Sequence, residues 1–317
     1  MSRAELTAAL ASGPVLLDGG LATELEAAGH DLSGALWSGR LLLEEPAAVT
    51  AAHARFFAAG ARVATTASYQ LSYAGLAALG VDRPGAEALL RRSVDVAAAA
   101  RDTTPDPGRR WVAASVGPYG TALADGSEYR GDYRLTVTQL RDWHRPRLAV
   151  LAEAGADLLA LETIPCLAEV EALLAEVAGT GVPCWLSLTC ASPTTTRAGE
   201  PVAEAFAMAR EVAEVIAVGV NCLDPRDAGP LVATAAEVSG KPVVVYPNSG
   251  EEWDAVRRSW SGTGAGLADR VPGWLADGAR LVGGCCRVSP AEIARMAERL
   301  PASPGATDSP NSFVTGI

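Results

Sequence analysis

The stretch DLLALE at residues 157–162 decides the fold, because it is a short apolar run that stops abruptly at a carboxylate. Segments rich in Ala and Leu, with charges at helical spacing, flank it at residues 136–154 and 168–178. Strands of a parallel sheet are buried on both faces and read as continuous apolar runs, and helices connect them. The stretch therefore predicts a buried β-strand in an α/β fold.

Seven similar apolar runs alternate with helical patterns along the rest of the chain. They lie at residues 15–18, 62–66, 112–116, 183–189, 215–220, 242–246 and 279–283, and the other helical patterns at 46–59, 85–101, 202–212, 227–238 and 290–300. Eight strands with helical crossovers are what a closed (β/α)8 barrel requires, and such barrels usually contain 200 to 400 residues. An open doubly wound sheet is the alternative, but eight evenly spaced units favour closure.

We expect a single barrel domain at residues 1–300, followed by a disordered tail at 301–317 that is rich in Pro, Ser and Gly. The formal charge of −11 argues against a nucleic-acid partner, since little positive charge is available to neutralise phosphates. No apolar run approaches the roughly 18 residues that span a bilayer, and no secretory signal pattern precedes the first strand. We therefore expect a cytoplasmic protein without a membrane partner, in which disulfides are rare.

The active site of such a barrel lies at the carboxyl ends of its strands, so the residues that follow each apolar run are informative. Polar and metal-capable side chains gather there. These positions are Asp18-Gly19-Gly20, Thr65-Thr66, Gly117-Pro118-Tyr119, Glu162-Thr163, Asn221-Cys222, Tyr246-Pro247-Asn248 and Gly283-Gly284-Cys285-Cys286. The sequence therefore predicts a functional site at this end of the barrel.

Three cysteines follow the sixth and eighth predicted strands, at Cys222, Cys285 and Cys286. Three thiolates that converge on one point are typical of zinc, and an open fourth position makes such a site catalytic. The spacing alone leaves another interpretation open, because free cysteines are often small buried hydrophobic residues. Adjacent cysteines do not easily bridge each other, so a disulfide between the last two is not expected.

The remaining cysteines and the histidines do not point to chemistry. Cys166 and Cys184 are expected in the core, and Cys190 at the rim is not predicted as a ligand. The three histidines are His30, His53 and His144, and none follows a predicted strand. A hydrolytic barrel usually gathers histidine and aspartate ligands at the rim, so we expect packing or surface roles for all three.

The chain resembles the homocysteine S-methyltransferases, in the branch that takes S-methylmethionine or S-adenosylmethionine as methyl donor. The resemblance covers residues 15–300 and rests on LLDGGLATELEAAG (16–29), LW (36–37), TTASYQ (65–70), SVGPYG (115–120), LETIP (161–165), GVNC (219–222), VVYPNSGEEWD (244–254) and GGCC (283–286). Two positions depart from the family pattern, which usually has Asn in place of Ala67 and SFTC where residues 187–190 read SLTC. Neither position touches the three cysteines.

The resemblance implies that Cys222, Cys285 and Cys286 hold Zn²⁺ and that the sulfur of homocysteine takes the fourth position. A free thiol is mostly protonated at neutral pH, and coordination to a metal removes that proton. No protein residue is then needed as the nucleophile. A sulfonium donor leaves as a neutral thioether, so no general acid is needed either.

The resemblance also assigns the amino-acid part of homocysteine. Glu162 is expected to bind the ammonium group with Asp18 nearby, although a structural hydrogen bond or a turn are the alternatives for these carboxylates. Backbone N–H groups at Gly19, Gly20 and the pair Thr65-Thr66 are expected to bind the carboxylate.

For the methyl donor, Trp37, Tyr69 and Tyr119 are candidates for cation–π contact with the sulfonium, and core packing is the alternative for each. The segment 249–273 is predicted as a long functional loop after the seventh strand. We expect Tyr246, Asn248 and Glu251, in or next to that loop, to bind the amino-acid group of the donor.

Three rival functions share the same barrel. Betaine is an alternative donor, and another thiol or a selenol is an alternative acceptor. A zinc-binding barrel without catalysis is the third. The sequence decides neither between the two sulfonium donors nor on the oligomeric state.

Overall fold

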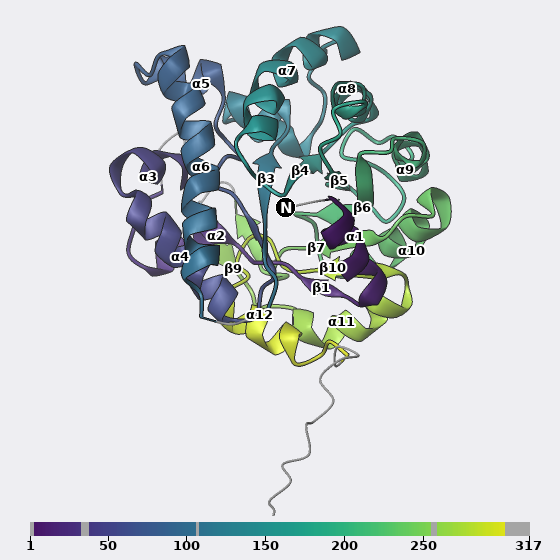
Figure 1. The fold of residues 1–317 in the computed structure, drawn as a ribbon. Coiled ribbons are helices and arrows are strands. Elements are labelled where there is room, and N and C mark those ends of the chain that lie inside the picture. Colours follow the sequence, from purple (N-terminus) through teal and green to yellow (C-terminus); the bar gives the residue numbers. More distant parts are fainter. Residues whose placement is uncertain (1–2, 33–37, 106–107, 255–258, 302–317) are drawn as a thin grey trace, which may run out of the picture.

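Eight parallel strands form a barrel with helices around it in the computed structural model, which describes residues 3–32, 38–105, 108–254 and 259–301 (Figure 1). The strands are β1 (Val15–Leu16), β2 (Val63–Thr65), β3 (Trp111–Val116), β4 (Leu158–Ile164), β5 (Cys184–Leu188), β6 (Val215–Asn221), β7 (Val243–Tyr246) and β10 (Ala279–Val282). Each predicted strand is present, with bounds that differ from the prediction by no more than two residues. The prediction of a (β/α)8 barrel is confirmed.

The barrel closes between its first and second strands. The hydrogen-bonded order is β1-β10-β7-β6-β5-β4-β3-β2, and a parallel bridge between Leu17 and Val63 joins the two ends of this order. The backbone N–H of Asp18 donates to the carbonyl oxygen of Val63 at 3.0 Å, and that of Arg62 donates to Leu16 at 2.7 Å. These contacts exclude the open doubly wound sheet.

The outer helices follow the predicted alternation. They are α2 (Leu21–Ala27), α3 (Ser38–Glu44), α4 (Pro46–Ala58), α5 (Tyr73–Ala78), α6 (Arg83–Thr103), α7 (Val137–Glu153), α8 (Leu167–Val177), α9 (Val202–Arg210), α10 (Ala228–Ser239), α11 (Leu267–Ala276) and α12 (Pro290–Ala297), with 3₁₀ turns at Tyr119–Leu123 and Ser127–Tyr129. Local signals fix several of their starts. Thr136 and Gln139 form a capping box on α7, and Ser289 caps α12 ahead of Pro290.

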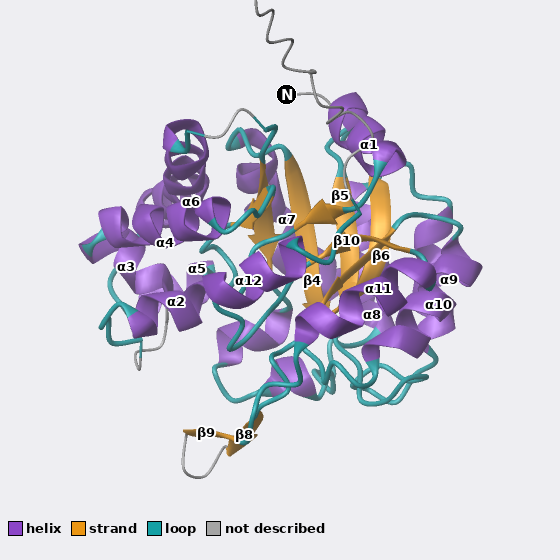
Figure 2. Cartoon of the chain, turned by 90° about the horizontal axis from the view of Figure 1, so that it is seen from below, coloured by secondary structure: helices purple, strands orange, loops and turns teal. Residues whose placement is uncertain are grey.

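The predicted loop at 249–273 contains more structure than expected. A short antiparallel hairpin, β8 (Glu252–Asp254) and β9 (Ser259–Ser261), is followed by the first residues of α11. Figure 2 shows this hairpin projecting from one end of the barrel. A strand of three residues is too short to produce a period in the sequence, so the pattern gave no sign of it.

The first helix, α1 (Arg3–Ser12), lies over the opposite end of the barrel (Figures 1 and 2). Its Leu6 and Leu10 are buried in the same apolar cluster as Trp111 and Trp185, whose side chains fill the barrel interior. A second, larger cluster fills the space between the strands and the outer helices. The amino end of the barrel is thus closed by apolar packing, and the carboxyl end is left for the site.

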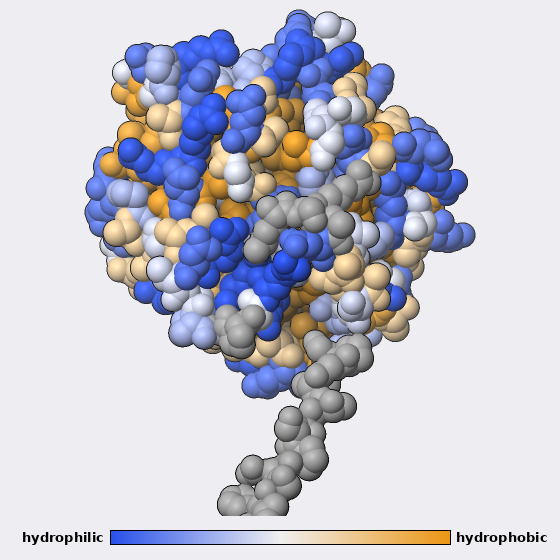
Figure 3. Space-filling view, viewed as in Figure 1, coloured by the Kyte–Doolittle hydropathy of each residue, from blue (hydrophilic) through white to orange (hydrophobic). Residues whose placement is uncertain are grey.

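The face seen in Figure 3 mixes hydrophilic and apolar residues, with the hydrophilic ones most prominent. Within the described part of the chain, no helix is long and apolar enough to cross a membrane. The predicted tail lies outside the described residues from residue 302 onward, and Trp37 also lies outside them. The division into a barrel at 1–300 and a tail stays a prediction.

Candidate active site

The three cysteines predicted as metal ligands meet at the carboxyl end of the barrel. The sulfur atoms of Cys222, Cys285 and Cys286 all lie within 4.8 Å of one another. The end of β7 holds them together, because the N–H of Cys222 donates to Tyr246 at 3.3 Å and that of Cys285 donates to Pro247 at 2.8 Å. A cluster that is scattered over 65 residues of sequence is therefore fixed by the backbone of one strand that lies between β6 and β10.

The sulfur atoms of Cys222 and Cys285 are in contact, and their Cα atoms are 5.6 Å apart, so this pair is placed where a disulfide could form. The strand ends bring the two Cα atoms into the range of about 4.4–6.8 Å that disulfides require. Metal coordination requires both sulfurs as thiolates. The same pair can therefore serve as metal ligands only in its reduced form.

The donor set fits a zinc ion. Three sulfurs that converge on one point are a typical catalytic zinc set, which leaves one position for a substrate. The sulfurs of Cys285 and Cys286 are 4.0 Å apart, near the separation of about 3.8 Å for two thiolates on one tetrahedral zinc. Cys286 is partly exposed, so the cluster is accessible to a ligand.

Asp18 and Glu162 are two buried carboxyl groups at the same end of the barrel. Asp18 accepts hydrogen bonds from the N–H of Thr65 at 2.7 Å and from its hydroxyl at 3.2 Å. Burial raises the pKa of Asp18 to about 8, and the charge of the nearby Glu162 adds to that rise. Burial also raises the pKa of Glu162 to about 7. Two carboxyl groups held in this way are stabilised in their charged form by an ammonium group.

A chain of hydrogen bonds orients Glu162. One carboxylate oxygen accepts from the hydroxyl of Ser115, and the other accepts from the hydroxyl of Tyr246 at 3.0 Å. The indole N–H of Trp185 donates in turn to the Tyr246 oxygen at 3.0 Å. The aromatic side chains of the barrel interior therefore support the carboxylate from below.

Asn221 clamps the ends of β4 and β6 together, which the sequence analysis did not predict. Its side-chain oxygen accepts from the N–H of Thr163 at 2.8 Å and from the hydroxyl of Ser187 at 2.7 Å, and its amide donates to the Thr163 hydroxyl at 2.7 Å. Thr163 and Cys222 both have left-handed backbones, with φ of +62° and +50°. Such conformations are unfavourable for these residue types and persist only when the surroundings hold them.

The position of Asn221 gives the clamp its importance. Thr163 directly follows Glu162, and Cys222 directly follows Asn221, so the clamp fixes a carboxylate and a cysteine at once. The sequence signal for this clamp was the amide side chain of Asn221, which lies next to a cysteine at the end of a predicted strand. Its partners on β4 and β5 could not be read from the sequence.

Most of the backbone N–H groups expected to bind the homocysteine carboxylate are already bonded within the protein. The N–H of Gly20 donates to Val288, that of Thr65 to Asp18 and that of Thr66 to Ala113. Gly19 and Gly20 instead allow close packing, since an added Cβ would lie 2.4 Å from the Val288 oxygen or 2.7 Å from the Cys285 oxygen. We therefore no longer assign carboxylate binding to the N–H groups of Gly20, Thr65 and Thr66.

The residues predicted to bind the donor fall into different places. The hydroxyl of Tyr246 donates to Glu162, one of the two buried carboxyl groups. Asn248 accepts from the N–H of Cys286 at 3.2 Å and its own N–H donates to Leu223 at 3.0 Å, so it positions a cysteine. Tyr69 packs its ring against Gly117, where an added Cβ would lie 2.7 Å from the ring.

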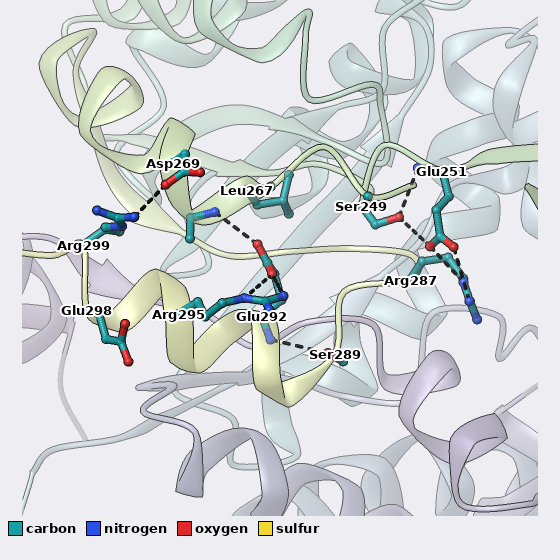
Figure 4. Close-up of a pocket in the computed structure, with 13 residues that line it drawn as sticks. Ser249, Glu251, Leu267, Asp269, Arg287, Ser289, Glu292, Arg295, Glu298 and Arg299 are labelled. Carbon is teal, nitrogen blue, oxygen red and sulfur yellow. Dashed lines mark hydrogen bonds and ion pairs between the residues drawn. The ribbon is translucent and has the colours of Figure 1, made fainter. Parts of the chain in front are cut away.

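Glu251 lines a cavity of about 560 Å³ with charged side chains in its wall (Figure 4). Arg287, which directly follows Cys286, lines the same cavity. The carboxylate of Glu251 pairs with Arg287 at 3.1 Å and accepts from the hydroxyl of Ser249 at 2.9 Å. Figure 4 also shows two ion pairs at the cavity wall, that of Arg295 with Glu292, both on α12, and that of Arg299 with Asp269. The charges of these arginines are thus balanced by neighbouring carboxylates.

Tyr119 is held by a buried charge network. Its N–H donates to Glu169 at 2.6 Å, and the same carboxylate oxygen bonds to the His144 ring at 2.8 Å. Arg147 donates to the carbonyl oxygen of Gly117 and lies over the Trp143 ring, 4.5 Å from its centroid. Burial lowers the pKa of His144, and its contact with Glu169 opposes that shift in part. The packing role expected for His144 therefore includes support of the loop after β3.

The other residues singled out in the sequence lie as expected. His53 is buried, and burial lowers its pKa to about 4. His30 is partly exposed and faces Glu45 at 3.5 Å. Cys166, Cys184 and Cys190 are buried.

Known proteins resemble this chain over most of its length. The family model of homocysteine S-methyltransferase matches residues 15–300. The homocysteine S-methyltransferase of Escherichia coli strain K12 is 45% identical over 295 residues, which are 90% of this chain and 94% of that protein. A selenocysteine Se-methyltransferase of Brassica oleracea var. italica is 42% identical over 309 residues, 91% of this chain and 89% of that protein.

Solved structures agree with these comparisons. The metallated form of the homocysteine methyltransferase MmuM from Escherichia coli superposes with a TM-score of 0.83 at 42% identity, covering 90% of this chain and 96% of that one. The oxidized form of the same protein gives a TM-score of 0.82 over the same shares of the two chains, also at 42% identity.

Proposed function

The chain belongs to the homocysteine S-methyltransferase family, and from this premise we propose that it is a zinc enzyme with a sulfonium methyl donor. The transfer of a methyl group to homocysteine follows from the family. The proposal adds the metal, the donor and the residues that bind each substrate. S-Methylmethionine is the first donor we propose and S-adenosylmethionine the second.

The three cysteines would hold the zinc ion, and their convergence within 4.8 Å is the observation that carries the proposal. When bound, zinc supplies a Lewis acid that lowers the pKa of the homocysteine thiol, so that the substrate reacts as a thiolate at neutral pH. Cys222, Cys285 and Cys286 hold it from the ends of β6 and β10. Asn248 and Asn221 fix the backbone on which these cysteines stand.

Glu162 and Asp18 bind the ammonium group of homocysteine in this proposal. Both are buried and both have a raised pKa, so a cation in contact with them relieves an unfavourable charge. The homocysteine thiolate attacks the methyl carbon of the donor, the carbon–sulfur bond of the sulfonium breaks, and its electron pair leaves on a neutral thioether. No proton has to be delivered to that leaving group. The work of the chain is to align the two sulfurs and the carbon.

We assign the donor to the rim formed by Tyr69 and Tyr119, and we place the protein in the cytoplasm with small molecules as its partners. A reducing compartment keeps the disulfide-forming pair open for metal. Trp37 and Glu251 stay predictions as donor contacts.

A selenol acceptor is a second candidate activity, because a relative at 42% identity carries the name selenocysteine Se-methyltransferase. A selenol acceptor would use the same three-cysteine site as the thiol of homocysteine. The two acceptors are compared directly in the assay below.

The test measures zinc content and thioether formation in protein purified under reducing conditions. Homocysteine is offered with S-methylmethionine, S-adenosylmethionine or betaine, and then selenocysteine replaces homocysteine. We expect one zinc per chain and methionine from a sulfonium donor, both lost in Cys285→Ala. The variant Cys184→Ala is the control, because that cysteine is buried in β5 away from the cluster. Protein without zinc, or zinc without transfer from any sulfonium, refutes the proposal.

A further inference from the structure

Arg197 lies in the connection between β5 and α9, which folds back over the rim of the barrel. Backbone bridges pair Cys190 with Thr196 and Thr195 with Pro201, and the N–H of Ala198 donates to the carbonyl oxygen of Pro165 at 3.2 Å. The connection is therefore fixed to the ends of β4 and β5. The backbone at Arg197 therefore has a defined position beside the site.

Its side chain is two hydrogen bonds away from a proposed metal ligand. The Nε of Arg197 donates to the hydroxyl oxygen of Thr189 at 3.2 Å, and that hydroxyl donates to the carbonyl oxygen of Cys222 at 3.1 Å. The guanidinium carbon lies over the ring of Tyr129, 5.4 Å from its centroid. One edge of the guanidinium is thus held by Thr189 and one face by Tyr129.

The charge of Arg197 has no carboxylate beside it. Among the residues that the structure describes, no carboxylate oxygen lies within the 4.0 Å of an ion pair from this side chain, in a chain with a formal charge of −11. Arg287 and Arg295, near the same rim, are each paired with a glutamate. Burial lowers the pKa of Arg197, because its charge is partly removed from water, and the negative charge of Asp227, beyond ion-pair distance, offsets this only in part. Such a guanidinium is suited to a carboxylate ligand.

The substrates supply such a carboxylate, and the site otherwise offers little to bind it. Homocysteine and both sulfonium donors are α-amino acids, and three of the expected N–H donors are used within the protein. We propose that Arg197 binds the α-carboxylate of an amino-acid substrate at the rim of the site. The inference rests on the proposed function, and it extends that function to a residue outside the expected set.

The experiment compares substrates with and without the carboxylate. One pair is homocysteine and 3-aminopropanethiol, and the other is S-methylmethionine and (3-aminopropyl)dimethylsulfonium. In the wild-type enzyme we expect kcat/KM to fall roughly 10- to 100-fold when the carboxylate is removed from the substrate that Arg197 binds, as a lost charge-assisted hydrogen bond predicts. In Arg197→Gln the two members of that pair should differ by less than about 3-fold, with the change mainly in KM. The pair that responds identifies the substrate.

Two further variants separate binding from folding. Arg197→Lys keeps the charge without the planar fork, and we expect it to restore part of the discrimination. Arg226→Gln removes an exposed arginine from the connection after β6, and it should behave as the wild type. The melting temperature of each variant, measured at one pH, shows whether the fold is intact.

An equal loss of kcat/KM by Arg197→Gln with both members of both pairs overturns the inference. Calorimetric binding of homocysteine and 3-aminopropanethiol to the zinc-loaded protein tests the homocysteine arm without turnover. Binding of S-methylmethionine and (3-aminopropyl)dimethylsulfonium in the absence of homocysteine tests the donor side in the same way. If no donor transfers methyl but Arg197→Gln abolishes discrimination in binding, the proposed function fails and this inference stands.

Discussion

The two ends of the barrel are built from the same eight strands and have opposite chemistry. At the amino end, Leu6 and Leu10 of α1 pack on the apolar interior. At the carboxyl end, Asp18 and Glu162 are also buried, but both carry ionisable carboxyl groups. Apolar packing stabilises the first end without any directional requirement. The second end tolerates the buried carboxyl groups of Asp18 and Glu162 because both have hydrogen-bond partners, so stability and reactivity are separated along the strands.

The transition between the two ends is made by Trp185 and Tyr246. Their rings are 6.0 Å apart within the apolar cluster, yet the Tyr246 hydroxyl bonds to Glu162. The apolar interior of the barrel is thus linked to the carboxyl end by the hydrogen bond from Tyr246 to Glu162. A variant at one end of the barrel, or at the boundary, can therefore be tested for its effect on the activity or the stability that the other end provides.

The largest effect should come from Glu162→Gln, which removes the charge that we assign to the ammonium group of homocysteine. Loss of a buried charge-assisted contact predicts a fall in kcat/KM for homocysteine of roughly 100-fold or more. The donor's KM should change by less than about 3-fold, and zinc content should stay at the wild-type level. Steady-state kinetics with each substrate varied in turn provide the measurement. An equal rise in both KM values would contradict the assignment.

Leu10→Ala should affect only the amino end. Leu10 is 4% exposed, and truncation of a buried leucine costs about 2–3 kcal/mol of unfolding free energy. We expect that loss in urea denaturation, with kcat/KM unchanged. Leu79→Ala is the matched control, because Leu79 is 54% exposed and should lose little stability. A fall in kcat/KM for Leu10→Ala would show that the two ends are coupled.

Asn221→Ala should loosen the carboxyl end by releasing the left-handed Thr163. We expect kcat/KM for homocysteine to fall about 10-fold, since Glu162 and Cys222 lose a shared support. The second change Thr163→Gly should recover part of that loss, because glycine adopts a positive φ without strain. Kinetics and zinc content of the single and double variants measure this. A double variant no better than Asn221→Ala would mean that the backbone conformation is not what the clamp provides.

The last prediction concerns pH. The pKa of Glu162 is raised from 4.5 to about 7 in the fold. Between these values the unfolded chain is ionised while the folded chain retains the proton, so the unfolding free energy decreases as pH rises through this window. Glu162→Gln removes that dependence. A pKa raised from 4.5 to about 7 corresponds to about 3 kcal/mol, so we expect the variant to gain up to that amount over the wild type at pH 8 and nothing at pH 4, as urea denaturation at both pH values can show. A gain independent of pH would be inconsistent with this origin.

The sequence predicted the features that depend on pattern along one strand. The eight apolar runs marked the strands, and reading the residues after them brought Cys222 and Cys285 together before any coordinates. It did not predict contacts between side chains on different elements. His144 and Glu169 meet across two helices, and the clamp of Asn221 depends on the backbone conformation of a residue 58 positions away. Nothing in the local sequence encodes such distances.

The pairing of β1 with β10 makes the barrel depend on the order in which the chain is synthesised. β1 contains two residues and is held by β10, whose residues are made more than 260 positions later. Cys285 and Cys286 follow β10 directly. A nascent or truncated chain that ends before this point has one cysteine of the three and an unpaired edge at β1. The cluster of three cysteines is therefore completed only when the barrel itself can close, so an unfinished chain lacks the site that we propose for zinc and homocysteine.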